Sequence, residues 1–429
     1  MRTRALVLLT LLTLLGLPTW GRSAVNHAPI RATTLWVGSS DSAIQTTAQT
    51  RYALPMAPET GDYSATEAAR EGVCPIDLTV DQLTVLLSAD IGDAGDTLTV
   101  TLREDAADTS LTCTISGGAG TEITCGDAAQ SFVCEAGHRI SMQLVTAATP
   151  AAAVTASWGI RSRPHRANRS VWLANQPGAS TSADRFFPAQ GAVSVAGTAD
   201  TGRVALPAAG SLVGLAVHSD NTYTSTQTRT ITAMVDGSAD TAVECVLDAA
   251  GVNACIDTSG PIMLVRGTTL SLRNTPANTP PADGLGVGVV FAPARSGTFV
   301  LLGGAGATGP ATSGTQYAQI ARGLGTWAST EAATKGVTRA LTVTGLYASV
   351  GAAPGAGADW NFYVRRVDTS TDTDATILIS GAAEVADFWE GSVDVPDLSA
   401  LNYKIVPSAG TAPAAPGATR ISMSATMPR

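Results

Sequence analysis

The chain repeats itself at an interval of about 130 residues. The segments TLTVTLRED, TRTITAMVD and DWNFYVRRV place Val100, Ile231 and Phe362 in register, and successive members of this set stand 131 residues apart. The segments TTLWVGSSDS, RSVWLANQPGAS and GTFVLLGGAGATG precede them, each a short apolar run that enters a glycine or serine turn. Because packing positions that recur at a fixed period indicate repeated structural units, the sequence predicts three copies of one module.

Within each copy the apolar residues alternate with polar ones, as in RISMQLV, LGVGVVF and ISMSATM. A period of two with one buried face is typical of antiparallel strands. Glycine-rich and acidic turn clusters separate these runs. We therefore expect an all-β chain of three tandem antiparallel β-sandwich domains of about 130 residues each, jelly-roll-like and joined in line. Their expected ranges are 24–163, 164–294 and 295–429.

The closing strands of the copies can be aligned in the same way. Placing VTASWGIRS on LGVGVVFAP matches Trp158 with Val289 and Ile160 with Phe291, and Ile421 of the third copy stands 132 residues after Val289. Few identities survive outside strand registers and turns. This predicts that packing positions are shared more faithfully than any binding site.

Residues 1–23 have the features of a secretory signal. Two arginines precede an apolar run from Ala5 to Leu15, and Pro18 and small residues follow. The alternative is an uncleaved anchor, but the run is shorter than the ~20 residues that a bilayer span needs, and no second apolar stretch of that length follows. We expect a secreted, extracellular or cell-surface protein, with the periplasm as an alternative, and no membrane span after signal removal.

Export changes how the cysteines are interpreted. An even number of cysteines in an oxidising compartment favours disulfides, and the close-spaced Cys/His pairs that zinc requires are absent. Six cysteines permit fifteen connectivities, so the third pair below is the least constrained. The expected pairs are two staples across β-hairpins, Cys113 with Cys125 and Cys245 with Cys255, and, by elimination, Cys74 with Cys134.

The charge balance limits the class of partner. The chain has 26 basic and 35 acidic side chains, a net charge of −9, and loss of the three arginines within residues 1–23 would make it −12. An acidic surface argues against nucleic acid as the main partner. The exception is RSRPHRANRS, where Arg161, Arg163, Arg166 and Arg169 gather; we interpret it as a solvated linker because it contains Pro164 and lacks apolar periodicity.

No catalytic motif is evident. The patterns GxSxG, HExxH, the P-loop and a GxGxxG between strand and helix are absent. His218 stands next to Ser219 and Asp220, but triads assemble from separated segments, so we interpret this stretch as a turn. The sequence predicts a protein that is not an enzyme.

Calcium is the one cofactor that the sequence suggests. Asp90, Asp93 and Asp96 in DIGDAGD offer hard oxygen ligands at close spacing, and DTSTDTD offers a similar set further along. Neither follows the order of an EF-hand, and the two do not align in the repeat. Solvated turn acids are the competing interpretation.

A surface glycan is the other candidate ligand, because β-sandwiches can present sugars with exposed rings. Only 5% of residues are aromatic, which limits the choice. Packing in the core or at an interface is the competing fate of each ring. The candidates that lie near predicted loops are Tyr317, Trp327, Trp389, Phe186 and Phe187.

The run TLTVTLREDAADTSLTCTISGGAGTEITC, followed by AGHRISMQLV and a closing alternating strand, resembles repeat units of exported bacterial surface and fibre-type proteins. These are similar to the trimeric jelly rolls of the tumour-necrosis-factor and C1q kind. The resemblance implies architecture, extracellular presentation and self-association, and it carries over no functional residue. We expect a non-enzymatic structural or assembly protein, fibre- or adhesin-like and homo-oligomeric; the alternative is a secreted carbohydrate-binding or receptor-binding module.

Overall fold

The structure is a computed structural model that places most of the chain after the predicted signal. The signal prediction for residues 1–23 lies outside the described residues. The structure describes residues 33–40, 43–44, 47–56, 63–118, 123–148, 154–192, 202–224, 226–248, 251–304, 309–321, 327–331, 336–408 and 411–428.

The fold is all-β, and its strands form six sheets that face one another in pairs. Every sheet is antiparallel except for one short parallel pairing, between β10 and β12. The first sandwich consists of β1 (Thr34–Ser39), β2 (Gln49–Ala53), the 3-10 helix η1 (Glu67–Arg70), β3 (Gly72–Val73), β4 (Leu78–Leu87), β5 (Thr97–Glu104), β6 (Ala107–Ser116), β7 (Thr124–Cys134), β8 (Arg139–Ala147) and β9 (Ala156–Pro164).

The other two sandwiches repeat this order of strands. The second consists of β10 (Ser170–Gln176), β11 (Arg185–Phe187), β12 (Gly191–Ala192), β13 (Val204–Ala205), β14 (Gly210–Ser219), β15 (Thr228–Val235), β16 (Ser238–Leu247), β17 (Ala254–Asp257), β18 (Ile262–Leu264), β19 (Thr269–Ala277) and β20 (Leu285–Pro293). The third consists of β21 (Thr298–Gly304), β22 (Gln316–Ala318), β23 (Gly336–Val337), β24 (Leu341–Val350), β25 (Asp359–Arg366), β26 (Thr371–Ser380), β27 (Ala386–Val395), β28 (Ala400–Pro407) and β29 (Thr419–Thr426).

Each sandwich has the strand order of a jelly roll. In the first, one sheet runs β1-β9-β4-β7 and the other β2-β8-β5-β6, with β3 beside β8. The third repeats this as β21-β29-β24-β27 and β22-β28-β25-β26, and the second differs by adding β12 and by dividing one edge strand into β17 and β18. If the longer strands are lettered B to I, the sheets read B-I-D-G and C-H-E-F, which is the jelly-roll arrangement.

Alternating burial builds each core, and the repeat register places equivalent residues in it. Val100, Ile231 and Phe362 are fully buried on β5, β15 and β25. They face Cys113, Cys245 and Ile377 across the neighbouring strand, as expected of copies of one unit. The third copy therefore has an isoleucine where the others have a cysteine.

The alignment predicted for the closing strands is wrong by two residues. Ile160 pairs with Trp36 on β1, Val289 pairs with Trp172 on β10, and Met423 pairs with Leu301 on β21. Ile160 is therefore equivalent to Val289, not to Phe291. A shift of two residues keeps each side chain on the same face of a strand, so alternation alone could not detect it.

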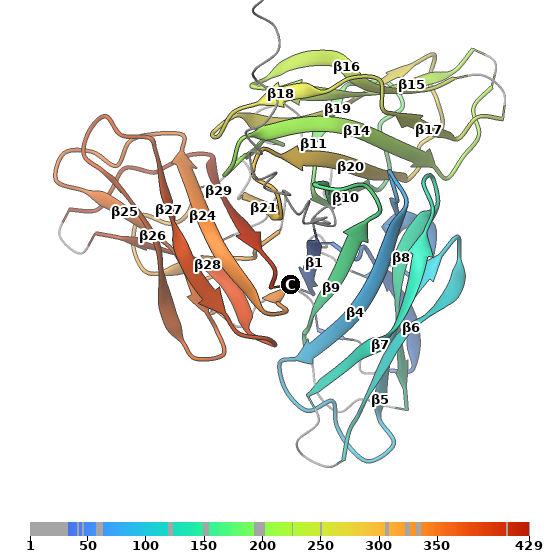
Figure 1. Cartoon of the computed structure of the whole chain (residues 1–429), viewed down its shortest axis with the longest axis horizontal. Coiled ribbons are helices and arrows are strands. Elements are labelled where there is room, and N and C mark those ends of the chain that lie inside the picture. The colour runs from blue at the N-terminus through green and yellow to red at the C-terminus, as the bar shows by residue number, and fades with distance from the viewer. Residues whose placement is uncertain are drawn as a thin grey trace, which may run out of the picture.

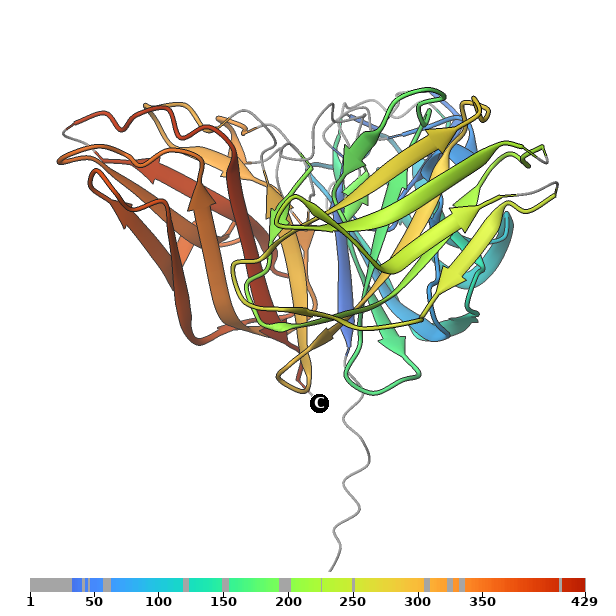
Figure 2. The same cartoon turned by 90° about the horizontal axis from the view of Figure 1, so that it is seen from above.

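The sandwiches are not joined in line, as the sequence suggested, but surround a common centre (Figure 1). Strands β1, β10 and β21 lie there and contact one another in all three combinations. The packing is cyclic: β3 of the first sandwich lies against β20 of the second, β13 of the second against β29 of the third, and β23 of the third against β9 of the first. The chain thus closes a ring with approximate threefold symmetry. Figure 2 shows the same ring edge-on.

The central strands are buried on both faces, which explains the ring. All residues of β1 and β10 are buried, whereas a strand at the edge of an isolated sandwich would expose alternate side chains. Two tryptophans continue the pattern across sandwiches. Trp36 Nε1 donates to Val171 O at 3.0 Å, and Trp172 Nε1 donates to Val300 O at 3.1 Å.

The six cysteines form the three expected pairs, Cys74–Cys134, Cys113–Cys125 and Cys245–Cys255. Their placement differs from the prediction of hairpin staples. Strand β6 pairs with β5 and strand β7 with β4, so Cys113–Cys125 joins the edges of two facing sheets. Cys245 on β16 and Cys255 on β17 do the same in the second sandwich. Three disulfides fit an oxidising, extracellular environment.

Candidate functional site

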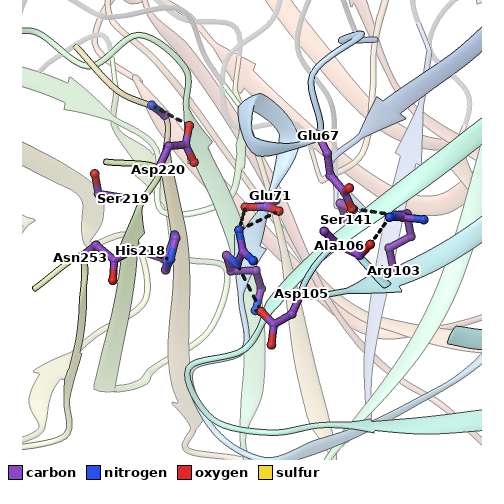
Figure 3. A network of polar contacts seen from close by, with 12 residues as sticks. Glu67, Glu71, Arg103, Asp105, Ala106, Ser141, His218, Ser219, Asp220 and Asn253 are labelled. Carbon is purple, nitrogen blue, oxygen red and sulfur yellow. Dashed lines mark hydrogen bonds and ion pairs between the residues drawn. The ribbon is translucent and has the colours of Figure 1, made fainter. Parts of the chain in front are cut away.

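The boundary between the first two sandwiches gathers titratable side chains from both. Glu71 directly precedes β3, His218 lies near the end of β14, and Asp220 follows that strand. Packing of β3 against β20 and β14 brings the three together. Figure 3 shows Glu71 between His218 and Asp220 on one side and Asp105 on the other.

Glycines allow this close approach. A Cβ at Gly288 would lie 2.0 Å from Val73 O, and a Cβ at Gly286 would lie 3.0 Å from Glu71 O. Larger residues at these two positions of β20 would force the sandwiches apart. Asn175 on β10 then fixes the segment, because its Nδ2 donates to Glu71 O at 2.9 Å.

One ligand atom each from Glu71, His218 and Asp220 lies within 4.8 Å of the other two. Each side chain also has a protein partner. Arg139 Nη1 donates to both carboxylate oxygens of Glu71, at 3.2 and 3.4 Å. The backbone N–H of Gly284 donates to Asp220 Oδ2 at 3.1 Å.

Burial governs the charges in this cluster. It raises the pKa of Glu71 to about 7 and that of Asp220 to about 6. It lowers the pKa of His218 to about 4, so the imidazole is neutral at physiological pH. A neutral imidazole and two carboxylates form a donor set that suits a divalent cation. Arg139, which also belongs to the first sandwich, already supplies a positive charge to Glu71.

His218 is not the turn residue that the sequence suggested, since it lies on β14. It does not form a triad with its neighbour either. The ring Nε2 of His218 lies 3.3 Å from Asn253 Nδ2, whereas Ser219 Oγ donates to the carboxylate of Asp283. Consecutive residues of a strand point to opposite faces, and these two accordingly contact different groups.

Behind Ser219 lies a buried ion pair that the sequence did not signal. Arg229 and Asp283 are both fully buried in their side chains and approach to 2.9 Å. Tyr223 Oη donates to the same aspartate at 2.7 Å. Buried charges are stable only when paired and hydrogen-bonded, so these residues form a polar core of the second sandwich.

The predicted aromatic candidates do not form a platform. Phe187 is fully buried, so its ring cannot meet a ligand; on β11 it points inward while Phe186 is half-buried. Trp327 and Trp389 are partly buried and pack against the core. Tyr317 lies on β22, pairs with Ala328 beside Trp327, and is also half-buried.

The carboxylates of the candidate calcium loop bind backbone groups of the same loop. Asp90 Oδ1 accepts the N–H of Gly92 at 3.2 Å, and Asp96 Oδ2 accepts the N–H of Asp93 at 2.9 Å. Asp96 is buried and Asp93 is exposed. Within the described part of the chain, these three do not gather their carboxylates as Glu71, His218 and Asp220 do. Likewise, Asp372 of DTSTDTD pairs with Arg365 and Lys404.

The arginine-rich segment divides into two parts. Arg161 and Arg163 belong to β9 and both bind Asp81, at 2.6 and 2.5 Å, so interpreting them as linker residues was wrong. Arg166 and Arg169 follow β9 and line a groove between the first two sandwiches. This groove lies beside Ser211, near the start of β14, and thus at the opposite end of that strand from His218.

Comparison with known proteins does not identify a family for this chain. No family model and no curated protein matches the chain. A chain from the atomic structure of Sulfolobus Turreted Icosahedral Virus is 12% identical, with a TM-score of 0.19, over 82% of this chain and 79% of that one. A structure of PNGF-II is 9% identical, with a TM-score of 0.20, over 52% and 57%. In the residues described, no helix has the length and apolar character to cross a bilayer.

Proposed function

We propose that the protein is a non-catalytic, exported structural protein whose three jelly rolls form one rigid head of an extracellular or cell-surface assembly. The cyclic packing of β3, β13 and β23 on the next sandwich carries this proposal. It arranges three sandwiches within one chain as subunits are arranged in a closed trimer.

The chemistry of the boundary supports a structural role. The strongly perturbed groups each have a partner in their own sandwich, Arg139 for Glu71 and the backbone of Gly284 for Asp220. The bond that crosses the boundary runs from Asn175 Nδ2 to Glu71 O. Perturbed pKa values occur at structural ion-pair networks as well as at catalytic sites. A disulfide joins the facing sheets of the first sandwich and another joins those of the second, which suits a protein that must persist outside the cell.

Self-association is the partner prediction that goes with this role. The edge strands of the second sandwich expose large apolar side chains, with Val246 on β16 39% exposed and Ile256 on β17, near Gly137 of the first sandwich, 46% exposed. Exposed edge strands with apolar side chains and few lysines favour pairing between copies. We therefore place the contact between copies at this edge.

Light scattering of the mature, disulfide-bonded protein over a range of concentrations tests the proposal. A mass that rises above that of one chain is expected, and Val246→Lys with Ile256→Lys should return it to a single chain. Val133→Lys is the matched control, because Val133 is 47% exposed on the corresponding edge strand β7 of the first sandwich. A single-chain mass at every concentration would reject assembly.

The second candidate function, a secreted binding module, is favoured by the groove that Arg166 and Arg169 line. A glycan array probed with the mature protein distinguishes the two roles. Concentration-dependent assembly supports the structural role whether or not a glycan binds, whereas glycan binding by a species that stays a single chain supports the binding module.

A further inference from the structure

The groove between the first and second sandwiches has a volume of about 430 Å³ and opens to solvent. Small-molecule sites in proteins typically have volumes of about 300–1,000 Å³. Both sandwiches contribute to it. Its wall contains Ile76, Arg166 and Arg169 from the first sandwich and the segment that follows, and Ser211, Met263 and Val290 from the second.

The two arginines face this groove without a carboxylate partner. In the described residues neither Arg166 nor Arg169 forms an ion pair, whereas Arg161 and Arg163 share Asp81. No acidic residue lines the groove. Burial, and then the charge of Arg166, lower the pKa of Arg169. Arg169 is partly buried and Arg166 is exposed. Two positive charges thus meet at the groove, and an anion would relieve their repulsion.

The boundary between the second and third sandwiches has a corresponding groove of about 440 Å³, and it contains its own carboxylate. There Arg266 forms an ion pair with Glu390. Strand register shows what replaces Glu390 in the first groove. Leu215 and Leu346 are equivalent, because each directly follows the glycine that comes after the bulge of its strand. Leu215 pairs with Asp257 and Leu346 pairs with Trp389, so Asp257 is equivalent to Trp389.

Thr258 therefore occupies the position of Glu390. The second groove holds a carboxylate at this position, and the first holds a neutral hydroxyl. The ring thus places an internal anion in one groove and leaves two guanidinium groups unneutralised in the other.

We propose that the groove between the first two sandwiches binds an acidic saccharide, through a carboxylate or sulfate group held by Arg166 and Arg169. Planar guanidinium groups bind such oxyanions with paired, charge-assisted hydrogen bonds. The hydroxyls of Ser211, Thr258 and Ser259 supply partners for sugar hydroxyls. Met263, 78% exposed beside Val290, offers an apolar surface to the face of a sugar ring.

The saccharide site goes beyond the structural role proposed above and does not depend on self-association. Titration calorimetry of the mature, disulfide-bonded protein at low ionic strength tests it. The probes are trigalacturonate, a sulfated disaccharide, neutral maltotriose and sodium sulfate. We expect at least one of the two acidic saccharides to bind, maltotriose not to bind, and the affinity to fall as salt is added.

Two variants test the residues. Arg166→Gln with Arg169→Gln should weaken binding by about tenfold or more, the loss expected when charge-assisted hydrogen bonds are removed. Thr258→Glu should have a similar effect, because it supplies the carboxylate that Glu390 supplies in the second groove. Arg295→Gln is the control, since Arg295 lines that second groove. Circular dichroism confirms that each variant is folded.

Three results would overturn the proposal. Neither acidic saccharide would bind, or the double arginine variant would bind as tightly as the natural protein, or sulfate alone would bind as tightly as the acidic saccharides. A negative result would leave the light-scattering test of assembly unaffected, so the two proposals can fail separately.

Discussion

Trp36 Nε1 donates a hydrogen bond to the backbone oxygen of Val171, 3.0 Å away in the neighbouring sandwich. Trp172 repeats the contact toward Val300 at 3.1 Å. Leu301 stands at the equivalent position of the third sandwich, so the third copy has lost the donor. Two of the three equivalent contacts therefore have a tryptophan donor, and at the third joint Gln319 Nε2 donates to Ser39 Oγ of the first sandwich instead.

Replacing Trp36 with phenylalanine should weaken the joint between the first two sandwiches. The change leaves the buried oxygen of Val171 without its donor, which costs about 1–3 kcal/mol. Trp158→Phe is the matched control, because its Nε1 donates to Pro55 O at 2.9 Å within one sandwich. In denaturant unfolding, Trp36→Phe should broaden or divide the transition, and Trp158→Phe should keep it single. Equal cooperativity in both variants would contradict a joint at Trp36.

Gly288→Ala should disrupt the same boundary by steric means. The new Cβ would lie 2.0 Å from Val73 O and 2.7 Å from Pro75 Cδ, and overpacking of this kind costs about 1–3 kcal/mol or more. Gly260→Ala is the control, since its nearest neighbour would be Ala242 O at 3.8 Å. Thermal unfolding should show a lower midpoint for Gly288→Ala alone. Unchanged midpoints in both variants would show that β3 does not pack on β20.

Removing Cys113–Cys125 should destabilise the first sandwich by about 3 kcal/mol, the value expected for a bridge that closes a loop of about a dozen residues. The double variant Cys113→Ala with Cys125→Ala tests this by chemical denaturation. The third sandwich has Ile377 at the equivalent position and serves as an internal reference. In this variant, limited proteolysis should cut the first sandwich before the third. Cleavage of the third sandwich first would contradict a stabilising role of Cys113–Cys125 in the first.

The boundary cluster predicts a particular pH dependence. Burial raises the pKa of Glu71 from 4.5 to about 7, so the folded state holds this proton more tightly and stability falls as pH rises from about 4.5 to 7. Asp220 acts in the same direction up to about pH 6. His218, lowered from 6.5 to about 4, acts in the opposite direction, because stability is lost as pH falls below 6.5.

Above pH 6.5, Glu71 is thus the member of this cluster whose titration still lowers stability, with Arg139 and Asp105 beside it. Melting temperatures measured between pH 6.5 and 7.5 should decline in the natural protein and stay level in Glu71→Gln. Glu135→Gln is the control, since the Glu135 side chain is 70% exposed. If the melting temperature of Glu71→Gln declines as much as that of the natural protein, a group other than Glu71 causes the pH dependence.

Local patterns in the sequence were enough to predict the module. The alternation of apolar and polar residues predicted the strands. Val100, Ile231 and Phe362 predicted the alignment of the three copies, because inward-facing positions in a sandwich tolerate few residue types. The spacing of Cys113 and Cys125 gave their pairing. It could not show that β6 and β7 lie in opposite sheets, since a hairpin and a crossing between sheets bring such cysteines equally close.

The same patterns could not predict how one sandwich packs on the next. Glu71 in the first copy precedes His218 in the second by 147 residues, and only the packing of β3 on the next sandwich brings it close to His218 and Asp220. One signal was present in the sequence: SVWLANQ on β10 lacks the alternation of a half-exposed strand, and it is buried throughout. Continuous burial of that kind indicates that a second surface covers the strand.

The closed ring is tested most directly by small-angle X-ray scattering of the mature protein, under conditions in which it is a single chain. A compact body of this length has a radius of gyration of about 22 Å, and the ring requires a value close to that. Three separate sandwiches joined in line, each one diameter from the next, would give about 30 Å or more. The compact value is expected, and the extended one would contradict the ring.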